Sequence, residues 1–308
     1  MKKVLITGSD GFVGSILRQS FKSAGFEVLG TVFFREGEED EVRLDITRSD
    51  SLQALPQQAF DIVIHTVGIV DQNAPKELMY SVNSDGTQHL LDWCKKVGCG
   101  HFIHISSIGV YGLRSIGENR IEDKTKTVGL VGVPYQKSKA LAESYVSKSG
   151  LPYTMLRLPV VIGSGDTFFS PTMRLALNTG NYFFYSRKDP LVSLLFVENL
   201  PSMLFKIIEK KPTCQIFNAG CHDVTWREII EEYARCMNIN IDRRPLRWRY
   251  ALQNLNNKSF LLTFTCAFFG QHFPADKLRN MFDWEPPYSW QVGVQKASIS
   301  RNINLANQ

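Results

Sequence analysis

Short apolar runs alternate with helical stretches along the first 165 residues, and this alternation constrains the fold more than any other feature of the chain. The strand-like runs are VLIT (4–7), EVLGTVFF (27–34), DIVIHTV (61–67), HFIHIS (101–106) and PYTMLRLPVV (152–161). Helical patterns lie between them over 12–24, 75–97 and 134–149. Strands that are apolar on both faces and alternate with helices belong to a parallel sheet covered on two sides. We therefore expect a doubly wound α/β fold.

After about residue 165 the predicted elements become shorter, and the regular alternation of strands and helices ends. Helical patterns over 168–179, 200–209 and 225–237 surround a strand-like run at 192–197. We predict a dinucleotide-binding domain over 1–165 and a smaller C-terminal α/β substrate lobe over 166–308, from which later segments can return to the first domain. Ligands of open α/β sheets bind at the carboxyl ends of the strands, so we expect the substrate between the two parts.

A glycine-rich loop, TGSDGFVG, lies where the first strand turns into the first helix. Gly8 permits a tight turn, Gly11 lets the backbone approach a pyrophosphate, and Gly14 lets the helix pack close to the sheet. This arrangement predicts a Rossmann-type parallel sheet with a nicotinamide dinucleotide as cofactor. A plain turn is the alternative for such a pattern, and the position directly after the first strand argues against it.

The end of the second strand bears on the choice between NADP and NAD. A carboxylate commonly binds the adenosine ribose there, but the sequence reads GTVFFR and has no acidic side chain before Glu36. Arg35 can instead meet a 2′-phosphate, which favours NADP, and the alternative is a solvated arginine beside the acidic run 36–41. Asp45 is placed to accept a hydrogen bond from the adenine amino group, or otherwise to cap the following turn.

Composition narrows the class of protein. The chain has 308 residues, of which 44% are apolar and 21% charged, as in ordinary globular proteins. Its 35 Lys and Arg against 30 Asp and Glu give a net charge of +5, too small and too dispersed to predict nucleic-acid binding. Six cysteines without a CxxC pair are interpreted as reduced thiols, which predicts a cytoplasmic protein. The six histidines show no metal-ligand spacing, so we expect no metal site.

We also expect no stable membrane span. The longest charge-free stretch, 259–274, holds about ten strongly apolar residues, whereas a span needs roughly twenty. A buried strand, a substrate lid and a loop that touches a membrane are the alternatives for this stretch. The N-terminal MKKVLITG lacks the apolar run of a signal peptide, so we expect the N-terminus to be part of the fold.

Tyr135 and Lys139 form a YxxxK pair just after Pro134, which suits the first turn of a helix. The spacing places both side chains on one face, where the ammonium group lowers the pKa of the phenol and can also hold the nicotinamide ribose. Tyr135 can then act as a general acid or base on a hydroxyl or ketone. Ser106 and Ser107 follow the strand-like run at 101–106, where a hydroxyl can polarise the substrate oxygen.

Together these motifs resemble those of the extended short-chain dehydrogenases/reductases, the NAD-dependent epimerase/dehydratase family. The resemblance rests on TGSDGFVG, YSVNSDGT, ISSIGVYG, PYQKSKALAE and LRLPVVIGSGD, and it covers nearly the whole chain. It implies Ser107 as the catalytic hydroxyl, Tyr135 as the acid or base, and Lys139 as the group that modulates Tyr135. It also implies that Asn83 supports the active-site helix and a bound water, and local hydrogen bonding is the alternative. The dinucleotide is further expected to contact Phe12, Val13, Ile46, Thr66, Val67 and Pro159.

Three positions depart from the pattern of the members that epimerise UDP-galactose. Those members hold the diphosphate with one asparagine and two arginines, where this chain has Val160, Val192 and Phe264. Each difference removes a donor that a buried phosphate needs. The basic string Arg243–Arg249 is a candidate substitute, and a solvated basic face is the alternative.

Three functions stay open at this point. The first is redox chemistry on a nucleotide sugar, as a 4-ketoreductase or 4-epimerase, because Ile108 and Gly109 stand where a dehydratase has an acidic pair. The second is a dehydrogenase or reductase of an unphosphorylated apolar alcohol or ketone, similar to 3β-hydroxysteroid dehydrogenases and dihydroflavonol reductases. The third is a non-catalytic dinucleotide-binding protein, which has no need of a complete catalytic set. The expected partners are a small-molecule substrate and, in a homodimer, a second copy of the chain.

Overall fold

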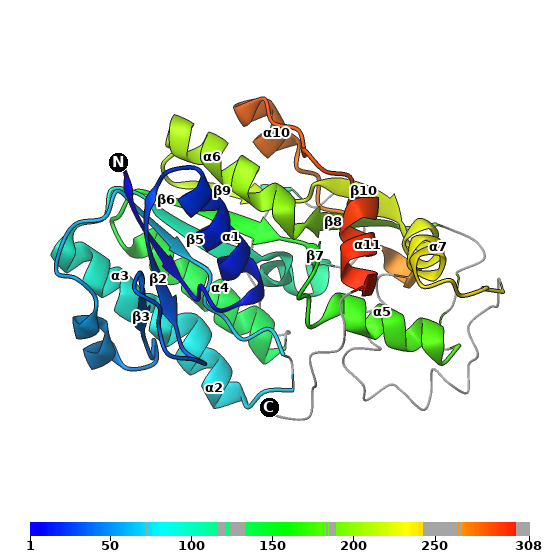
Figure 1. The fold of residues 1–308 in the computed structure, drawn as a ribbon, viewed down its shortest axis with the longest axis horizontal. Coiled ribbons are helices and arrows are strands. Elements are labelled where there is room, and N and C mark those ends of the chain that lie inside the picture. Colours follow the sequence, from blue (N-terminus) through cyan, green and yellow to red (C-terminus); the bar gives the residue numbers. More distant parts are fainter. Residues whose placement is uncertain are drawn as a thin grey trace.

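A seven-stranded sheet, in the order β3-β2-β1-β4-β5-β6-β9, runs through the larger part of the molecule (Figure 1). The structure is a computed structural model that describes residues 1–71, 73–115, 121–122, 133–180, 182, 184, 189–242, 264 and 267–299. Every neighbouring pair of strands in the sheet is parallel. The expected Rossmann-type, doubly wound α/β fold is therefore confirmed.

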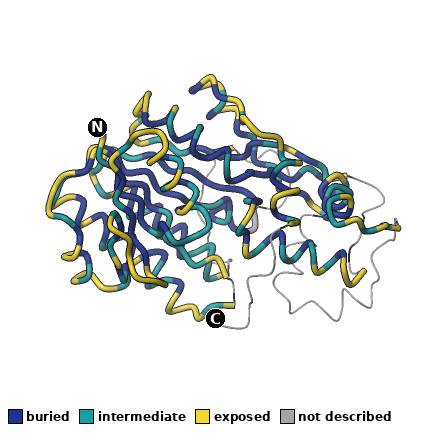
Figure 2. Tube along the Cα trace, viewed as in Figure 1, coloured by how far each residue is buried: buried dark blue, intermediate teal, exposed yellow. Residues whose placement is uncertain are grey.

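The strands of this sheet are short and mostly buried, as their apolar sequences require. They are β1 Lys3–Thr7, β2 Glu27–Val32, β3 Glu41–Arg43, β4 Ile62–His65, β5 Phe102–Ser107, β6 Tyr153–Leu158 and β9 Gln215–Asn218. Figure 2 shows them as a buried layer between elements that are exposed on their outer sides. The strand order reverses between β1 and β4, and ligands of such sheets bind at the carboxyl ends of the strands on either side of that switch.

Helices cover both faces of the sheet and bury an apolar side against it. On one face, α1 (Phe12–Ser23), α6 (Leu200–Lys210) and α10 (Asp276–Phe282) share a core with the strands. On the other face, α3 (Gly86–Val97) and α4 (Pro134–Lys148) form a second core, together with a 3-10 helix at Ser49–Ala54. Packing in these two cores fixes the position of each helix relative to the sheet. It therefore also fixes the positions of the side chains that lie at the carboxyl edge of the sheet.

A second, three-stranded sheet forms a smaller lobe, on the right in Figure 1. Its strands are β7 (Val160–Ile162), β8 (Leu191–Phe196) and β10 (His222–Thr225), and β10 is antiparallel to β8. The helices α5 (Phe169–Asn178), α7 (Trp226–Cys236) and α11 (Trp290–Ile299) share one apolar core with it. Because β9 lies in the large sheet, the segment after residue 165 contributes to both parts of the molecule.

Two expected strands have different bounds, each for a local reason. The run 152–161 is divided into β6 and β7, because Pro159 has no amide hydrogen to continue the ladder. The run 27–34 ends at Val32, because the next two amides donate to the carboxylate of Asp10 at 2.7 and 2.9 Å.

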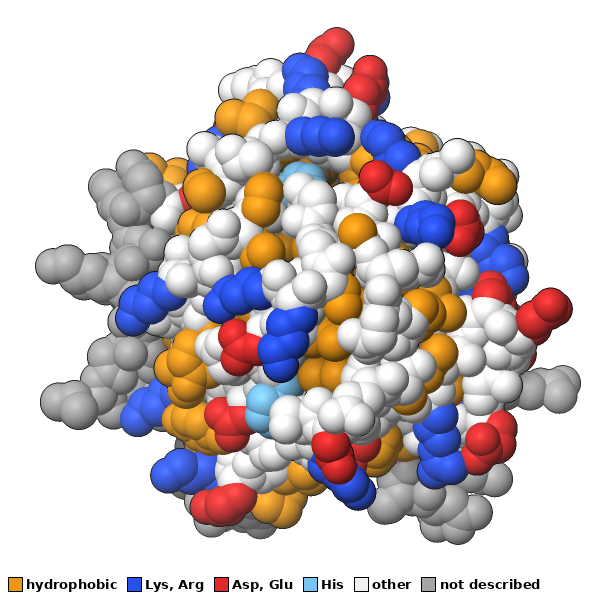
Figure 3. Space-filling view, turned by 90° about the vertical axis from the view of Figure 1, so that its left-hand side faces the viewer, with side chains coloured by type: hydrophobic (Ala, Val, Ile, Leu, Met, Phe, Trp, Pro, Cys, Tyr) orange, Lys and Arg blue, Asp and Glu red, His pale blue; other side chains and the backbone are white. Residues whose placement is uncertain are grey.

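The structure also bears on the expectations about membranes and metals. Within the described ranges, no helix is both long enough and apolar enough to cross a bilayer. In the same residues, no group of three or more His, Cys, Asp or Glu side chains is placed to bind a metal ion. The face in Figure 3 carries acidic, basic and apolar side chains interspersed. The string Arg243–Arg249 lies outside the described residues, and of the stretch 259–274 only residues 264 and 267–274 lie within them.

Candidate active site

The turn between β1 and α1 forms a cradle of backbone amides. Gly8 has φ +74°, a left-handed conformation that favours glycine, and its carbonyl accepts from the amide of Gly11 at 3.0 Å. A Cβ atom on Gly14 would lie 2.0 Å from the Gly8 carbonyl oxygen, so the close start of α1 requires glycine there. The first turn of a helix has amides without partners inside the helix, and these suit the pyrophosphate of a dinucleotide.

Thr66 and Val67, which directly follow β4, form the floor of this cradle. The Thr66 hydroxyl donates to the Thr7 carbonyl at 2.6 Å. A Cβ atom on Gly8 would lie 3.1 Å from both Thr66 Oγ1 and Val67 Cγ2, so the loop rests directly on these two side chains. The structure thus brings the three glycines and these two residues together at the switch point.

Four further residues predicted to contact the dinucleotide contribute to the packing around the cradle. Phe12 opens α1, and Val13 packs against the cores of both the large sheet and the smaller lobe. Ile46 is 5% exposed and packs against Gly86, and Pro159 is buried between β6 and β7. Ile46 and Pro159 therefore present little side-chain surface to a ligand, and their contact with the dinucleotide stays a prediction.

Arg35 is held by a buried carboxylate at the end of the cradle where the adenosine is expected. Its Nη2 atom lies 2.6 Å from Glu41 Oε2, and the Arg35 side chain is 41% exposed, whereas that of Glu41 is 0% exposed. Glu41 also accepts from the Ser9 hydroxyl at 3.0 Å and lies 3.3 Å from Arg18 Nε. Sequence reasoning singled out neither Glu41 nor Asp10, because both act through contacts with distant parts of the chain.

Asp45 turns its carboxylate onto the backbone that follows it. Its Oδ1 atom accepts from the Thr47 amide at 3.0 Å and from the Thr47 hydroxyl at 2.6 Å. This is the local capping role that the sequence left open. The contact with the adenine amino group stays a prediction.

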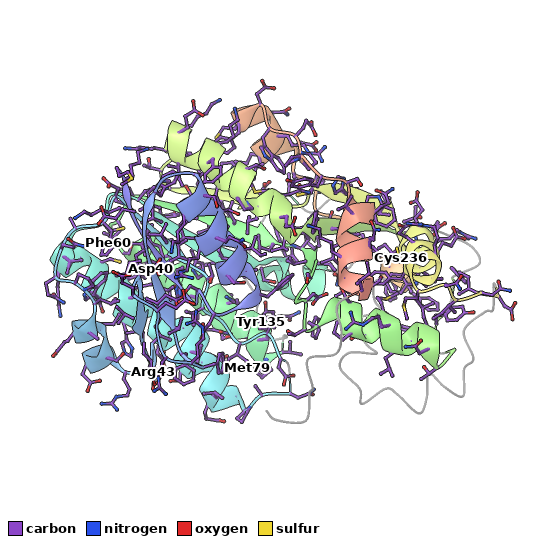
Figure 4. All side chains as sticks on the ribbon, viewed as in Figure 1. Asp40, Arg43, Phe60, Met79, Tyr135 and Cys236 are labelled. Carbon is purple, nitrogen blue, oxygen red and sulfur yellow. The ribbon has the colours of Figure 1, made fainter. Side chains whose placement is uncertain are left out.

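Ser107 and Tyr135 meet at the carboxyl end of β5. Ser107 is the last residue of that strand, and Tyr135 lies in the first turn of α4 (Figure 4). A Cβ atom on Gly109 would lie 3.2 Å from the Tyr135 ring and 3.4 Å from Ser107 Oγ, so this glycine leaves room for the two side chains to meet. The pKa of Tyr135 is raised, whereas the sequence predicted that it would be lowered, because burial outweighs the opposing effect of a hydrogen bond with Ser107.

Lys139 lies one turn after Tyr135 and is only 4% exposed. Its Nζ atom donates to the Ile105 carbonyl at 3.4 Å. A Cβ atom on Gly68 would lie 2.7 Å from that Nζ atom, so Gly68 provides the space for the ammonium group. Sequence reasoning missed Gly68, whose one signal is a glycine directly after a strand-like run. Burial lowers the pKa of Lys139 to about 8, and the charge of Glu143 opposes this change.

Asn83 lies in a π-helical segment, Ser81–Asp85, between α2 (Lys76–Tyr80) and α3, where the sequence predicted one helix over 75–97. Its side chain accepts from the Ile69 amide at 2.8 Å and donates to the Ile69 carbonyl at 3.1 Å and to Ser138 Oγ at 3.0 Å. These partners lie 14 and 55 residues away, so the bonding is not local. Asn83 thus joins the segment after β4 to the helix that carries Tyr135 and Lys139.

Two buried histidines on neighbouring strands stack with their ring centroids 5.4 Å apart. The ring nitrogens of His65 hydrogen-bond the Thr7 hydroxyl at 2.8 Å and the Thr87 hydroxyl at 3.0 Å. Burial lowers the pKa of His65 to about 3, and burial, His65 and Lys139 lower the pKa of His104 well below its ordinary value. Both rings are therefore uncharged near neutral pH. Neither adds a second positive charge that would compete with Lys139 for a carboxylate.

The three positions that depart from the UDP-galactose pattern lie in the core of the smaller lobe. Val160 and Val192 are buried in one apolar cluster, and Phe264 packs against the same cluster. An apolar core offers no donor to a phosphate, so these positions do not form a diphosphate site.

Comparisons with known proteins agree with this geometry. A family model described as "NAD dependent epimerase/dehydratase family" matches residues 4–220. A UDP-glucose 4-epimerase from Vibrio cholerae is 26% identical over 96% of this chain and 94% of its own length. A decarboxylating sterol-4-alpha-carboxylate 3-dehydrogenase from Schizosaccharomyces pombe is 27% identical over 65% of this chain and 62% of its own length. A dTDP-D-glucose 4,6-dehydratase from Dictyostelium discoideum is 25% identical over 71% of this chain, which spans 58% of that protein's length.

Two solved structures share the fold over nearly the whole chain. A UDP-glucose 4-epimerase with UDP-glucose from Thermotoga maritima has a TM-score of 0.73 at 17% identity, covering 96% of this chain and 97% of that one. RMD from Pseudomonas aeruginosa, complexed with NADPH, has a TM-score of 0.69 at 20% identity, covering 97% and 98%. At such identities the likeness shows the fold.

Proposed function

This chain belongs to the NAD-dependent epimerase/dehydratase family, and from that premise we propose that it acts on a nucleotide sugar, as a 4-ketoreductase or 4-epimerase. Its family and its relatives make it an oxidoreductase that uses a nicotinamide dinucleotide. The observation that carries the proposal is the meeting of Ser107 with Tyr135, one helical turn before the buried Lys139. Such a set suits redox chemistry at a carbinol or ketone carbon.

The three side chains divide the work on the substrate oxygen. When bound, the nicotinamide supplies or accepts the hydride at the neighbouring carbon. Tyr135 gives a proton to the substrate oxygen or takes one from it, and Ser107 donates a hydrogen bond to the same oxygen. The positive charge of Lys139 favours the phenolate form of Tyr135 while the proton is away. The amides of the glycine loop hold the pyrophosphate.

The proposal of a sugar substrate rests on relatives and on the residues after Ser107. The epimerase of Vibrio cholerae aligns with almost the whole chain, whereas the sterol dehydrogenase aligns with about two thirds of it. Dehydration is disfavoured because Ile108 and Gly109 carry no acidic group, and Gly109 packs against the Tyr135 ring. Reduction and epimerisation need no such group.

A second candidate, oxidation or reduction of an unphosphorylated apolar alcohol or ketone, is supported by the smaller lobe. Val160, Val192 and Phe264 belong to an apolar cluster and replace the usual diphosphate donors. The sterol dehydrogenase of Schizosaccharomyces pombe is a relative that is named for an unphosphorylated sterol substrate. The two candidates differ in whether a diphosphate must be bound.

For the cofactor, the proposal is NADP over NAD, with the 2′-phosphate meeting the exposed side of Arg35. The guanidinium stands at the end of the cradle and is fixed there by Glu41, so little side-chain entropy is lost on binding. Because Glu41 partly balances the charge of Arg35, the contact of Arg35 with the phosphate is weaker than that of an arginine without an acidic partner.

A substrate panel with a labelled cofactor tests the proposal. The protein is incubated with C4-deuterated NADPH or NADH and either 4-keto nucleotide sugars or apolar ketones such as 3-ketosteroids, and the products are analysed by mass spectrometry. UDP-hexoses, incubated with the protein and unlabelled NAD or NADP, test epimerisation, which shows no net use of the dinucleotide. Deuterium in a sugar product, or epimerised sugar, is the expected result. Turnover of the apolar ketones alone would contradict the proposed sugar substrate and support the second candidate.

A further inference from the structure

A buried ion pair joins α4 to β6 behind the candidate active site. Arg157 Nη2 lies 2.5 Å from Glu143 Oε2, and Arg157 Nε donates to Glu143 Oε1 at 2.9 Å. The two side chains are 1% and 5% exposed. Burying two charges costs free energy that their attraction often fails to recover, so stability alone is a poor reason for this pair.

The pair contacts side chains on both sides of Ser107 in the sequence. The Ser106 hydroxyl donates to Glu143 Oε1 at 2.6 Å, and Ser106 directly precedes Ser107 on β5. The Arg157 guanidinium lies 4.8 Å from the centre of the Tyr111 ring, and Tyr111 follows Ser107 by four residues. These contacts fix the end of β5 and the turn after it.

Glu143 also belongs to the helix that carries the acid or base. It follows Lys139 by four residues and Tyr135 by eight, so all three project from one side of α4. The charge of Glu143 acts on Lys139 and opposes the lowering of its pKa by burial. From the strands packed below, His65 and His104 also face Lys139, and both rings are neutral. Glu143, which is already paired with Arg157, is thus the carboxylate whose charge acts on Lys139.

We propose that Glu143 is a positioning residue for the reaction at Ser107 and Tyr135. Its carboxylate holds α4 against the strand that carries Ser107, and it faces Lys139 with a negative charge. This inference rests on the proposed redox function of the site. It adds a group that contacts neither substrate nor cofactor.

The test is the pH dependence of kcat/KM for Glu143→Gln. Removing a nearby negative charge makes Lys139 lose its proton more easily, and it acts in the same direction on the phenol of Tyr135. The apparent pKa of the pH–rate profile should therefore fall by about one unit. Because α4 loses its anchor, kcat should fall at least about tenfold, with little change in the Kd of the dinucleotide.

Two further variants separate this role from a merely structural one. Glu143→Gln with Arg157→Met removes both buried charges, so it should unfold at a higher temperature than Glu143→Gln while its apparent pKa stays below that of the wild type. Thr154→Val removes the bonds of a buried hydroxyl to His101 and to the Pro212 carbonyl, at the other end of β6. It should lower the unfolding temperature and leave the pH–rate profile unchanged.

An unchanged apparent pKa in both Glu143 variants would overturn the inference. So would a shift of equal size in Thr154→Val, because it would follow from lost stability alone. Tyr135→Phe, assayed beside them, tests the proposed function separately. If it is inactive while the Glu143 variants keep the wild-type profile, only the role of Glu143 is wrong.

Discussion

Arg35 is the residue on which the proposed preference for NADP over NAD depends. A charge-assisted contact with a 2′-phosphate is worth about 1.5 to 3 kcal/mol, which corresponds to a roughly ten- to a hundredfold preference for NADP. The pairing with Glu41 places the expected value at the lower end of that range. Arg35→Ala should remove most of the preference and leave the Kd for NAD nearly unchanged.

Calorimetric titration of NAD and NADP into both proteins measures this directly. Arg43→Ala is a matched control, because Arg43 is exposed and pairs with Glu36 in the same region. Equal affinities in the wild type, or a preference for NAD that survives Arg35→Ala, would show that Arg35 serves only its ion pair with Glu41.

Substitutions at two glycines of the β1–α1 turn should have different effects. Gly11→Val should abolish dinucleotide binding in a folded protein, because the branched side chain would occupy the path of the pyrophosphate. Gly14→Ala should instead lower the free energy of unfolding, since its Cβ atom would collide with the Gly8 carbonyl. Urea unfolding and calorimetry separate the two effects. Unchanged affinity in folded Gly11→Val would remove the phosphate cradle from the account.

Sequence reasoning reached those site residues that carry a local signal. Gly8, Gly11 and Gly14 follow a strand, and Tyr135 and Lys139 have helical spacing, so their neighbourhood in the fold could be predicted. Glu41 and Gly68 could not be found in this way. Gly68 is important through its contact with Lys139, far along the chain. Glu41 is important because its carboxylate is buried beside Arg35, and the acidic run 36–41 does not distinguish it from exposed members such as Glu36.

At the scale of elements, the buried histidines of β4 and β5 couple stability to pH. Neither ring nitrogen of His104 has a hydrogen-bond partner among the described residues. Its pKa in the fold is depressed below the ordinary value of 6.5, as is that of His65. Protonation thus favours the unfolded chain, so the stabilisation is complete above pH 6.5 and is lost as the pH falls toward the depressed value.

We expect the free energy of unfolding to decrease below pH 6.5 by up to about 1.4 kcal/mol per pH unit for each histidine. His104→Leu should flatten this dependence, and it should stabilise the protein at pH 8 because an unpaired polar ring leaves the core. Urea unfolding at pH 8 and pH 5 provides the comparison. An equally steep loss in His104→Leu would mean that other groups dominate the acid response.

A helix or strand could be predicted from the sequence where a single hydrophobic periodicity extends over its whole length. β1, α1, β5 and α4 lie close to their expected places, because short apolar runs and helical spacing determine them locally. The π-helical segment around Asn83 could not be predicted, since the Asn83 side chain bonds to Ile69 and to Ser138 of α4, which lie 14 and 55 residues away. Pro159 was visible in the sequence, but its effect of sending β7 to a second sheet was not foreseen.

At the scale of the whole molecule, the large sheet was predictable and the smaller lobe much less so. The parallel sheet follows from a repeated strand–helix alternation, which is a property of consecutive residues. The smaller lobe is built from β7, β8 and β10, whose partners come from separate stretches, while β9 leaves to join the large sheet. A segment after residue 165 thus returns to the large sheet, as the sequence allowed.

In the proposed reaction, Tyr135 exchanges a proton with the substrate oxygen beside Ser107 and Lys139. Tyr135→Phe keeps the ring and removes only that proton, so kcat should fall by about two orders of magnitude or more, and the Kd of the dinucleotide should stay nearly unchanged. Steady-state kinetics on the substrate found by the panel, together with calorimetry of the dinucleotide, measures both quantities. A folded Tyr135→Phe protein with near wild-type kcat would contradict the account.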